Sequence, residues 1–339
     1  MVLQLGKLIE VCKATVLCSD QMNLDSDFLS FEINSLLFDS RRLNSANHTV
    51  FFAIRTANND GHRYISELYD KGVRIFVCTI RPEKLQNGAY YLLVEDSLKA
   101  LQRLATYARN SFSGNVIAIG GSNGKTIVKE WSRVLIAQDK KVCFSPRSYN
   151  SQIGVAVSLW QLNENFEAGI FEAGISEPNE MQSLHDMILP DTGLITNIGE
   201  AHGANFSSIE EKLNEKLKLF EGCKRLICSQ DNPMLFEKVS EFCKSNNIEL
   251  ISYDTESMAR KLQLPFEDRV KCSFSLCPMH SIGNRRRQTP TTHRHAHAFG
   301  YANADSIDRK LDSAERLLLS RHHILGSRLG LPEHTRPKS

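Results

Sequence analysis

The 339-residue sequence contains no C-x-x-C pair among its nine cysteines, and no apolar run approaches the ~20 residues that a membrane-spanning helix needs. The chain also starts without the long apolar core of a secretory signal, and its formal net charge is only +2. The cysteine spacing excludes a zinc ribbon, and the odd cysteine number argues against a disulfide framework. We therefore expect a cytoplasmic protein with reduced thiols, no membrane span and no nucleic-acid partner.

Hydrophobic residues make up 41% and charged residues 24% of the chain, as in ordinary globular proteins. From Asn115 to Tyr253, short β-rich runs alternate regularly with helix-like segments. This alternation predicts βαβ units and a doubly wound, mostly parallel sheet, in which ligands bind at the carboxyl ends of the strands. The expected strands are 116–119, 142–145, 169–174, 193–198, 225–229 and 248–253.

The first hundred residues resemble a separate and smaller α/β unit. We expect it to form an N-terminal domain over residues 1–112, followed by a central domain over 113–270. Its strand-like runs are 49–54, 73–79 and 90–95, and its helix-like segments are 62–72 and 97–111.

The last part of the chain, residues 271–339, differs sharply in composition. It contains twelve Lys and Arg against five Asp and Glu, a net charge of +7, which leaves −5 for residues 1–270. Seven of the eleven histidines lie there, and the strand–helix alternation does not continue. This predicts an irregular basic tail that is either disordered or does not continue the fold of the preceding residues.

The run GGSNGKT at 120–126 lies between a predicted strand and a predicted helix. The standard longer phosphate loop would need a glycine at position 119, where the chain has Ile119. A shorter loop of this kind can still turn its backbone N–H groups and the helix N-terminus toward phosphates, whereas the alternative is an ordinary glycine-rich turn. The flanking strand and helix favour an ATP site formed by Gly121, Ser122, Asn123, Gly124, Lys125 and Thr126. In it, Lys125 would neutralise phosphate charge and Thr126 would bind Mg²⁺.

Three further polar residues follow at or after predicted strand ends. Glu172 is an acid within an apolar strand, which is costly to bury without a cation, so a Mg²⁺ ligand is its natural role and a surface position the alternative. His202 follows the next strand and could be a second metal ligand, although a loop histidine is more often exposed. Lys216 shares a helix with Lys212 and Lys218, which by composition alone indicates a solvated face.

Together these motifs resemble the Mur ligase family, ATP-dependent amide-forming ligases of peptidoglycan synthesis. The family's short G-x-x-G-K-[ST] loop is matched at Gly121–Thr126, and its E-x-G motif at Glu172–Gly174. Its T-N-I-x-x-x-H motif is matched at Thr196–His202, and its A-K-x-x-L-[FY] motif is similar to the run at 215–220. The resemblance implies a catalytic set of Lys125, Glu172, His202 and Lys216. It also implies two Mg²⁺ ions, one on Thr126 and Glu172, the other on His202 and a carbamylated Lys216.

Within the family, the chain is most similar to the branch that adds D-alanyl-D-alanine to UDP-N-acetylmuramoyl-tripeptide. The run FDSRRL at 38–43 resembles that branch's UDP-sugar-binding motif, with Ser40 and Arg41 as contacts. The run at 148–160 resembles its substrate loop, with Asn150 and Ser151 facing the muramoyl-peptide, and the resemblance adds Asn197 to the substrate-binding residues. The implied fold is a small N-terminal α/β UDP-binding domain followed by a P-loop ATPase domain with a doubly wound parallel sheet.

The resemblance implies that the tripeptide carboxylate attacks the γ-phosphate of ATP, and that the amine of D-alanyl-D-alanine then attacks the acyl phosphate. The family's third domain, with its D-[ST]-Y-N-x-N-P motif, has no counterpart in residues 271–339, so we hypothesise that this tail is out of frame or otherwise aberrant. Two alternatives stay open: a non-catalytic nucleotide- and substrate-binding remnant, and another ligase of the superfamily such as a folylpolyglutamate synthetase.

Overall fold

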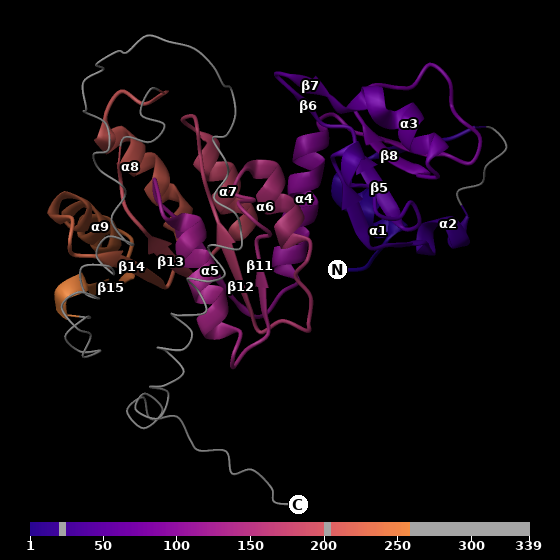
Figure 1. Ribbon diagram of the computed structural model, residues 1–339. Coiled ribbons are helices and arrows are strands. Elements are labelled where there is room, and N and C mark those ends of the chain that lie inside the picture. The colour runs from indigo at the N-terminus through magenta and orange to yellow at the C-terminus, as the bar shows by residue number, and fades with distance from the viewer. Residues whose placement is uncertain (20–24, 200–204, 258–339) are drawn as a thin grey trace, which may run out of the picture. The chain divides into compact units, whose positions relative to one another are not determined.

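The structure is a computed structural model that describes residues 1–19, 25–199 and 205–257 (Figure 1). It has the mixed α/β architecture predicted from the sequence, with a six-stranded and a five-stranded sheet. His202 and the predicted tail at 271–339 lie outside the described residues. The domain boundaries predicted at residues 112 and 270 stay predictions.

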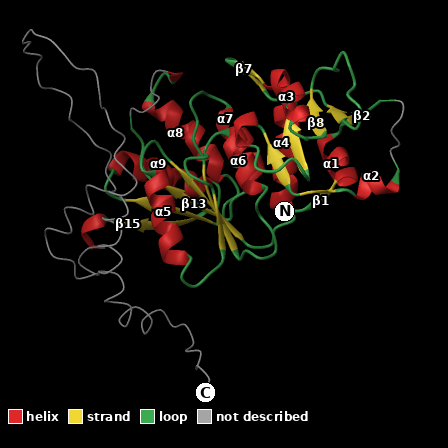
Figure 2. Cartoon of the chain, turned by 45° about the vertical axis from the view of Figure 1, so that its right-hand side comes forward, coloured by secondary structure: helices red, strands yellow, loops and turns green. Residues whose placement is uncertain are grey.

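The six-stranded central sheet is parallel throughout, as the alternating pattern predicts. Figure 2 shows strands of this sheet, among them β13 and β15. The strand order of the sheet is β11-β12-β10-β13-β14-β15. The first strand in sequence, β10, therefore has β12 and β11 on one side and β13, β14 and β15 on the other. Ligands of open parallel sheets bind where the strand order reverses in this way, outside the carboxyl ends of the strands. The strands are β10 (Asn115–Gly120), β11 (Val142–Phe144), β12 (Ala168–Glu172), β13 (Thr192–Ile195), β14 (Arg225–Ser229) and β15 (Glu249–Tyr253).

Successive residues of a strand point to opposite faces of the sheet, and helices pack on both of these faces. Ala118 belongs to a core cluster that includes residues of α6, α7 and α9, whereas its neighbour Ile119 packs in a cluster with Val128 and Ile136 of α5. The helices are α5 (Lys125–Ile136), α6 (Gln152–Leu159), α7 (Glu180–Ile188), α8 (Ile209–Leu217) and α9 (Pro233–Ser245), and the 3-10 helix η4 (Lys218–Phe220) follows α8.

The N-terminal part contains the five-stranded sheet, in the order β2-β9-β8-β5-β4. Four of its strands are parallel, and β2 pairs antiparallel with β9 at the edge. Two short antiparallel pairs, β1–β3 and β6–β7, lie outside it. The strands are β1 (Leu3–Gln4), β2 (Thr15–Leu17), β3 (Glu32–Ile33), β4 (Ser35–Leu37), β5 (Thr49–Phe52), β6 (Arg55–Thr56), β7 (Asn59–Asp60), β8 (Ile75–Cys78) and β9 (Tyr90–Leu93).

The helix α4 (Ser97–Asn110) contacts helices of both parts of the chain, namely α1, α6 and α7. Its start is defined by Asp96, whose side chain accepts hydrogen bonds from the N–H groups of Leu98 and Lys99 at 2.8 and 3.0 Å. Its buried positions repeat with helical spacing, and this periodicity is what predicted the helix. The remaining helices are α1 (Leu5–Cys12), α2 (Ser26–Ser30), α3 (Ile65–Asp70), η1 (Ser40–Arg42) and η2 (Gly61–Tyr64).

Two expectations about residue types can be compared with the described residues. Of the cysteines in them, Cys12, Cys78, Cys143, Cys223, Cys228 and Cys243 are free thiols. No helix in the described ranges is long and apolar enough to span a membrane.

Candidate functional site

The phosphate-loop sequence follows β10 directly, at the point where the strand order reverses. Gly121 has φ +126 and Gly124 has φ +80, both in the region that favours glycine. A Cβ at position 121 would lie 2.1 Å from Thr196 Oγ1, whereas a Cβ at position 124 would meet nothing within 4 Å. Gly121 is therefore required by both its backbone conformation and its neighbours, and Gly124 by its conformation alone.

The segment after β13 holds this loop in shape through a set of short hydrogen bonds. Thr196 Oγ1 donates to Asn123 O at 2.6 Å, and Ser122 N donates to Asn197 O at 2.9 Å. The Asn197 side chain makes two hydrogen bonds with the Asn123 backbone. Asn197 Oδ1 accepts from Asn123 N at 3.1 Å, and Asn197 Nδ2 donates to Asn123 O at 3.2 Å. Gly199 N also donates to Ser122 Oγ at 3.1 Å. The T-N-I sequence thus shapes the phosphate loop, and the substrate-binding role of Asn197 stays a prediction.

Lys125 begins α5 and bends back over the loop. Its Nζ donates to the carbonyl oxygens of Gly121 and Ser122 at 2.9 and 3.1 Å. Burial lowers the pKa of Lys125, while the nearby carboxylate of Glu172 acts in the opposite direction and Lys212 adds to the lowering. In this structure the ammonium group is therefore held at the loop by its carbonyl oxygens.

Glu172 ends β12, and its side chain is fully buried. Its Oε2 accepts a hydrogen bond of 2.8 Å from Thr126 Oγ1, while its Oε1 is buried without a hydrogen-bond partner. Burial raises the pKa of Glu172, and the Thr126 hydrogen bond and the charge of Lys129 oppose that rise. A buried carboxylate oxygen with an unused lone pair beside a threonine hydroxyl fits the donor set that Mg²⁺ prefers.

Lys129 is a fully buried lysine that the sequence reasoning missed. From the second turn of α5 its Nζ donates to Ser145 O at 2.8 Å and to Arg147 O, and it lies 3.9 Å from Glu172 Oε1. Its position four residues after Lys125 puts both ammonium groups on the same side of the helix. That spacing was a signal in the sequence, but nothing local distinguishes it from a solvated lysine.

Lys216 is buried, with 2% of its surface exposed, so the solvated-face interpretation does not apply to it. Its Nζ donates to Gly121 O at 3.2 Å, which brings it to the phosphate loop from α8. Burial, together with the charges of Lys125 and Lys212, lowers the pKa of Lys216 to about 7. Lys212, one turn earlier, is also buried and donates to Gly199 O.

The structure therefore brings Lys125, Thr126, Glu172 and Lys216 together around one loop. The fourth predicted catalytic residue, His202, lies outside the described residues. Among the described residues, no three His, Cys, Asp or Glu side chains gather as a metal cluster.

Residues of the two segments expected to bind substrate line one pocket, whose volume is about 250 Å³. Phe38, Asp39 and Arg42 lie on one side of it, and Pro146 and Tyr149 lie on the other. The Arg42 guanidinium stacks over the Tyr149 ring at 5.4 Å from its centroid, which links the two segments.

Four of the five residues named for substrate binding lie in these segments. Ser40 is buried, whereas Arg41 is exposed and pairs with Asp39 at 2.8 Å. Asn150 packs against Gly174, so that the substrate loop contacts the E-x-G motif directly, and Asn150 O accepts from Gly174 N at 2.9 Å. Ser151 caps α6 by accepting from Gly154 N at 3.3 Å. Their contacts with a substrate stay predictions.

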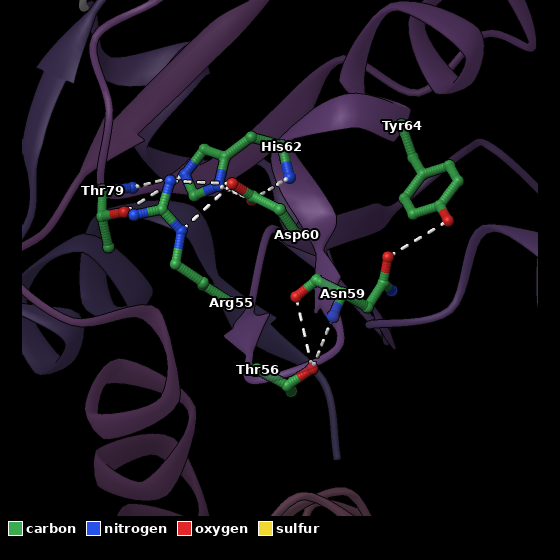
Figure 3. Close-up of polar contacts among 7 residues, drawn as sticks. All are labelled: Arg55, Thr56, Asn59, Asp60, His62, Tyr64 and Thr79. Carbon is green, nitrogen blue, oxygen red and sulfur yellow. Dashed lines mark hydrogen bonds and ion pairs between the residues drawn. The ribbon is translucent and has the colours of Figure 1, made fainter.

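A second polar cluster lies beside the β6–β7 pair (Figure 3). Asp60 accepts from Arg55 Nη2 at 2.8 Å and contacts His62 Nδ1 at 2.6 Å. His62 Nε2 accepts from the backbone N–H of Thr79 at 3.0 Å, so the proton resides on Nδ1 and is donated to Asp60. Both ring nitrogens are therefore used within the fold, which indicates a role in joining β7, η2 and the end of β8.

The central part of the chain is similar to a known protein family. Residues 119–284 match the family profile described as the Mur ligase middle domain. The UDP-N-acetylmuramoyl-tripeptide--D-alanyl-D-alanine ligase of Synechocystis sp. is 33% identical over 231 residues, which are 67% of this chain and 49% of that protein. The ligase of the same name from Rickettsia prowazekii is 32% identical over 192 residues, 57% of this chain and 42% of that protein. The chain thus spans about half the length of the curated relatives it matches.

Solved structures share the fold. A crystal structure of MurF from Acinetobacter baumannii superposes with a TM-score of 0.65 at 22% identity, covering 74% of this chain and 53% of that one. MurF ligase from Thermotoga maritima, solved in complex with ADP, superposes with a TM-score of 0.57 at 24% identity, covering 66% and 51% of the two chains.

Proposed function

We propose that this chain belongs to the Mur ligase family and is part of an ATP-dependent amide-bond ligase of peptidoglycan precursor synthesis. That ligase adds D-alanyl-D-alanine to UDP-N-acetylmuramoyl-tripeptide. The observation that carries the proposal is the 2.8 Å hydrogen bond between Thr126 and Glu172 beside a glycine loop at the reversal point of a parallel sheet. The activity, substrates and partners are proposed for the whole ligase, because the chain spans about half of its curated relatives.

ATP would bind with its phosphates against the N–H groups of the loop at 121–126 and the N-terminus of α5. Lys125 would turn from the loop carbonyls to the β- and γ-phosphates, and Thr126 and Glu172 would hold one Mg²⁺ between them. The unused Oε1 of Glu172 supports this assignment. Bound Mg²⁺ would supply charge neutralisation for the transferred phosphoryl group.

Lys216 would hold a second Mg²⁺ as a carbamate, together with His202. Carbamate formation requires a neutral amine that attacks carbon dioxide, and a pKa of about 7 makes the neutral form of Lys216 available near neutral pH. This explains why a lysine occupies a position where metal binding needs an oxygen anion.

The UDP-muramoyl substrate would occupy the pocket between the 38–43 and 146–149 segments, with Ser40, Arg41, Asn150 and Ser151 among its contacts. Asn150 supports this path, since it touches Gly174, two residues after the proposed metal ligand Glu172. The tripeptide carboxylate would attack the γ-phosphate of ATP, releasing ADP and forming an acyl phosphate, and the D-alanyl-D-alanine amine would then displace phosphate. A cytoplasmic location belongs to this proposal, because ATP is one of the substrates.

Calorimetric titration of the full chain with Mg·ADP and with UDP-N-acetylmuramoyl-tripeptide tests the two binding sites, with Lys125→Met as the nucleotide-site control. We expect both ligands to bind to the wild type and the nucleotide alone to lose affinity in the variant. Phosphate release with ATP, the tripeptide substrate and D-alanyl-D-alanine then tests catalysis. Binding without turnover would favour a non-catalytic remnant, and binding of a folate instead of the UDP substrate would favour a folylpolyglutamate synthetase. The absence of all binding would refute the proposal.

A further inference from the structure

Lys129 contacts both the metal-binding carboxylate proposed above and the loop that follows β11. Its Nζ has three hydrogens, and two of them point to the carbonyl oxygens of Ser145 and Arg147. The same nitrogen lies 3.2 Å from Glu130 Oε1 and 3.9 Å from Glu172 Oε1. The side chain is fully buried, so water does not substitute for these contacts.

The loop held by Lys129 leads directly into the substrate pocket. Pro146, between the two carbonyl acceptors, lines that pocket together with Tyr149, which stacks on Arg42. Ser148 Oγ lies 3.4 Å from Thr126 Oγ1, which is a second contact between this loop and the phosphate site. Residues 145–149 therefore contact the phosphate site through Ser148 and line the pocket through Pro146 and Tyr149.

The backbone of this loop is strained at the residue that Lys129 holds. Arg147 has φ +50, in the left-handed region that costs a non-glycine residue free energy. Such a conformation persists only where surrounding contacts enforce it. The hydrogen bond that the buried Lys129 donates to Arg147 O is such a contact.

We propose that Lys129 is a positioning residue that couples nucleotide binding at the phosphate loop to substrate binding in the pocket at Arg42 and Tyr149. The inference rests on the proposed function for the identity of the two ligands. Glu172 would present less negative charge to Lys129 when it holds Mg²⁺. Lys129 then interacts less with Glu172 and more strongly with the carbonyls of Ser145 and Arg147, since charge-assisted hydrogen bonds depend on the charge available to them. The loop becomes better ordered, and the pocket binds its substrate more tightly.

The test measures the dissociation constant of UDP-N-acetylmuramoyl-tripeptide with and without the magnesium complex of β,γ-methylene ATP. In the wild type we expect the nucleotide to tighten substrate binding by about fivefold or more, the lower end of usual coupling between sites. In Lys129→Met the ratio of the two constants should fall to about one. Lys140→Met removes an exposed lysine shortly after the same helix and should keep the wild-type ratio.

A double variant separates charge from strain. Adding Arg147→Gly to Lys129→Met lets residue 147 adopt its positive φ without cost. We expect the double variant to regain the affinity for the substrate that is measured without nucleotide. The ratio of the two dissociation constants should stay near one. A purely structural role for Lys129 predicts instead that both are regained together. Retention of the full ratio in Lys129→Met, or a ratio of one in the wild type, would overturn the inference.

Amide hydrogen exchange in the ligand-free chain keeps this test independent of the ligands. The N–H groups of Tyr149 and Asn150 donate to Pro146 O and Ser148 O at 3.2 and 2.9 Å within the loop. We expect their exchange to be roughly tenfold faster or more in Lys129→Met, because hydrogen bonds to a charged group are lost. Unchanged exchange would refute the positioning role. Failure of the wild type to bind either ligand would refute the proposed function, and the exchange rates would then decide the role of Lys129.

Discussion

Thr126 Oγ1 and Glu172 Oε2 lie 2.8 Å apart, although 46 residues separate them along the chain. The register of the central sheet explains this contact, since Ile119 of β10 is paired with Glu172 of β12. The strand end that carries the acid therefore lies beside the start of the loop that leads into α5. The two oxygen ligands of the proposed Mg²⁺ site are brought together by backbone pairing.

Glu172→Gln should remove most of the Mg²⁺ dependence of nucleotide binding. The amide keeps the shape of the side chain but loses the charge, so we expect the gain in ADP affinity on adding Mg²⁺ to fall by about tenfold or more. Thermal stability should be retained or rise, because a buried carboxylate becomes neutral. Titration calorimetry with and without Mg²⁺ measures the effect, with the exposed Glu167→Gln as control. An unchanged Mg²⁺ effect would remove Glu172 from the site.

Gly121→Ala and Gly124→Ala should differ in severity. A Cβ at 121 meets the Thr196 hydroxyl, so we expect a loss of stability of about 2 kcal/mol or more and no nucleotide binding. At 124 the space is open and only the positive φ is penalised, by about 1 to 2 kcal/mol. Urea unfolding and ADP titration measure both effects. Equal losses in the two variants would contradict the tight contact between the loop and Thr196.

Lys216→Met should change how stability depends on pH. The folded pKa of about 7 lies below the ordinary lysine value of 10.5, so between these values the unfolded chain binds more protons, and stability rises with pH by at most about 1.4 kcal/mol per unit. The variant lacks this rise and should be more stable than the wild type near pH 7, with the difference shrinking toward pH 10. Denaturant unfolding between pH 7 and 10 measures it. Lys218→Met, on the following turn, should run parallel to the wild type, and a parallel Lys216→Met curve would contradict the low pKa.

Asp60→Asn should destabilise the N-terminal part at neutral pH but not in acid. The Arg55 hydrogen bond lowers the pKa of Asp60, and the hydrogen bonds from His62 act in the same direction. The stabilisation is present above the unfolded value near 3.8 and is lost as the pH falls through the lower folded value. We expect a loss of about 1 kcal/mol at pH 7 that shrinks below pH 4, measured by thermal unfolding. Asp70→Asn, an exposed position at the end of α3, serves as control. A constant difference at all pH values would show that charge is not involved.

The sequence alone determined the elements of the central sheet and the composition of the phosphate loop. All six strands predicted between Asn115 and Tyr253 are present, because hydrophobic runs and turn residues act locally. The one at 193–198 ends earlier, at Ile195, since the residues after it bend away to hold Asn123. The helix α1 was not predicted. Its amphipathic segment is short, and its buried face can be recognised only once it packs against the rest of the core.

The sequence motifs already named Lys125 and Lys216, but only the tertiary structure shows that Lys129 and Lys212 are buried at the site. Lys129, Lys212 and Lys216 have the local spacing of solvated lysines, yet at most 2% of each is exposed. Their burial depends on how α5 and α8 pack around the ends of β10, β12 and β13. Strand order and register set that packing through contacts between residues far apart in sequence, and no local pattern contains this information.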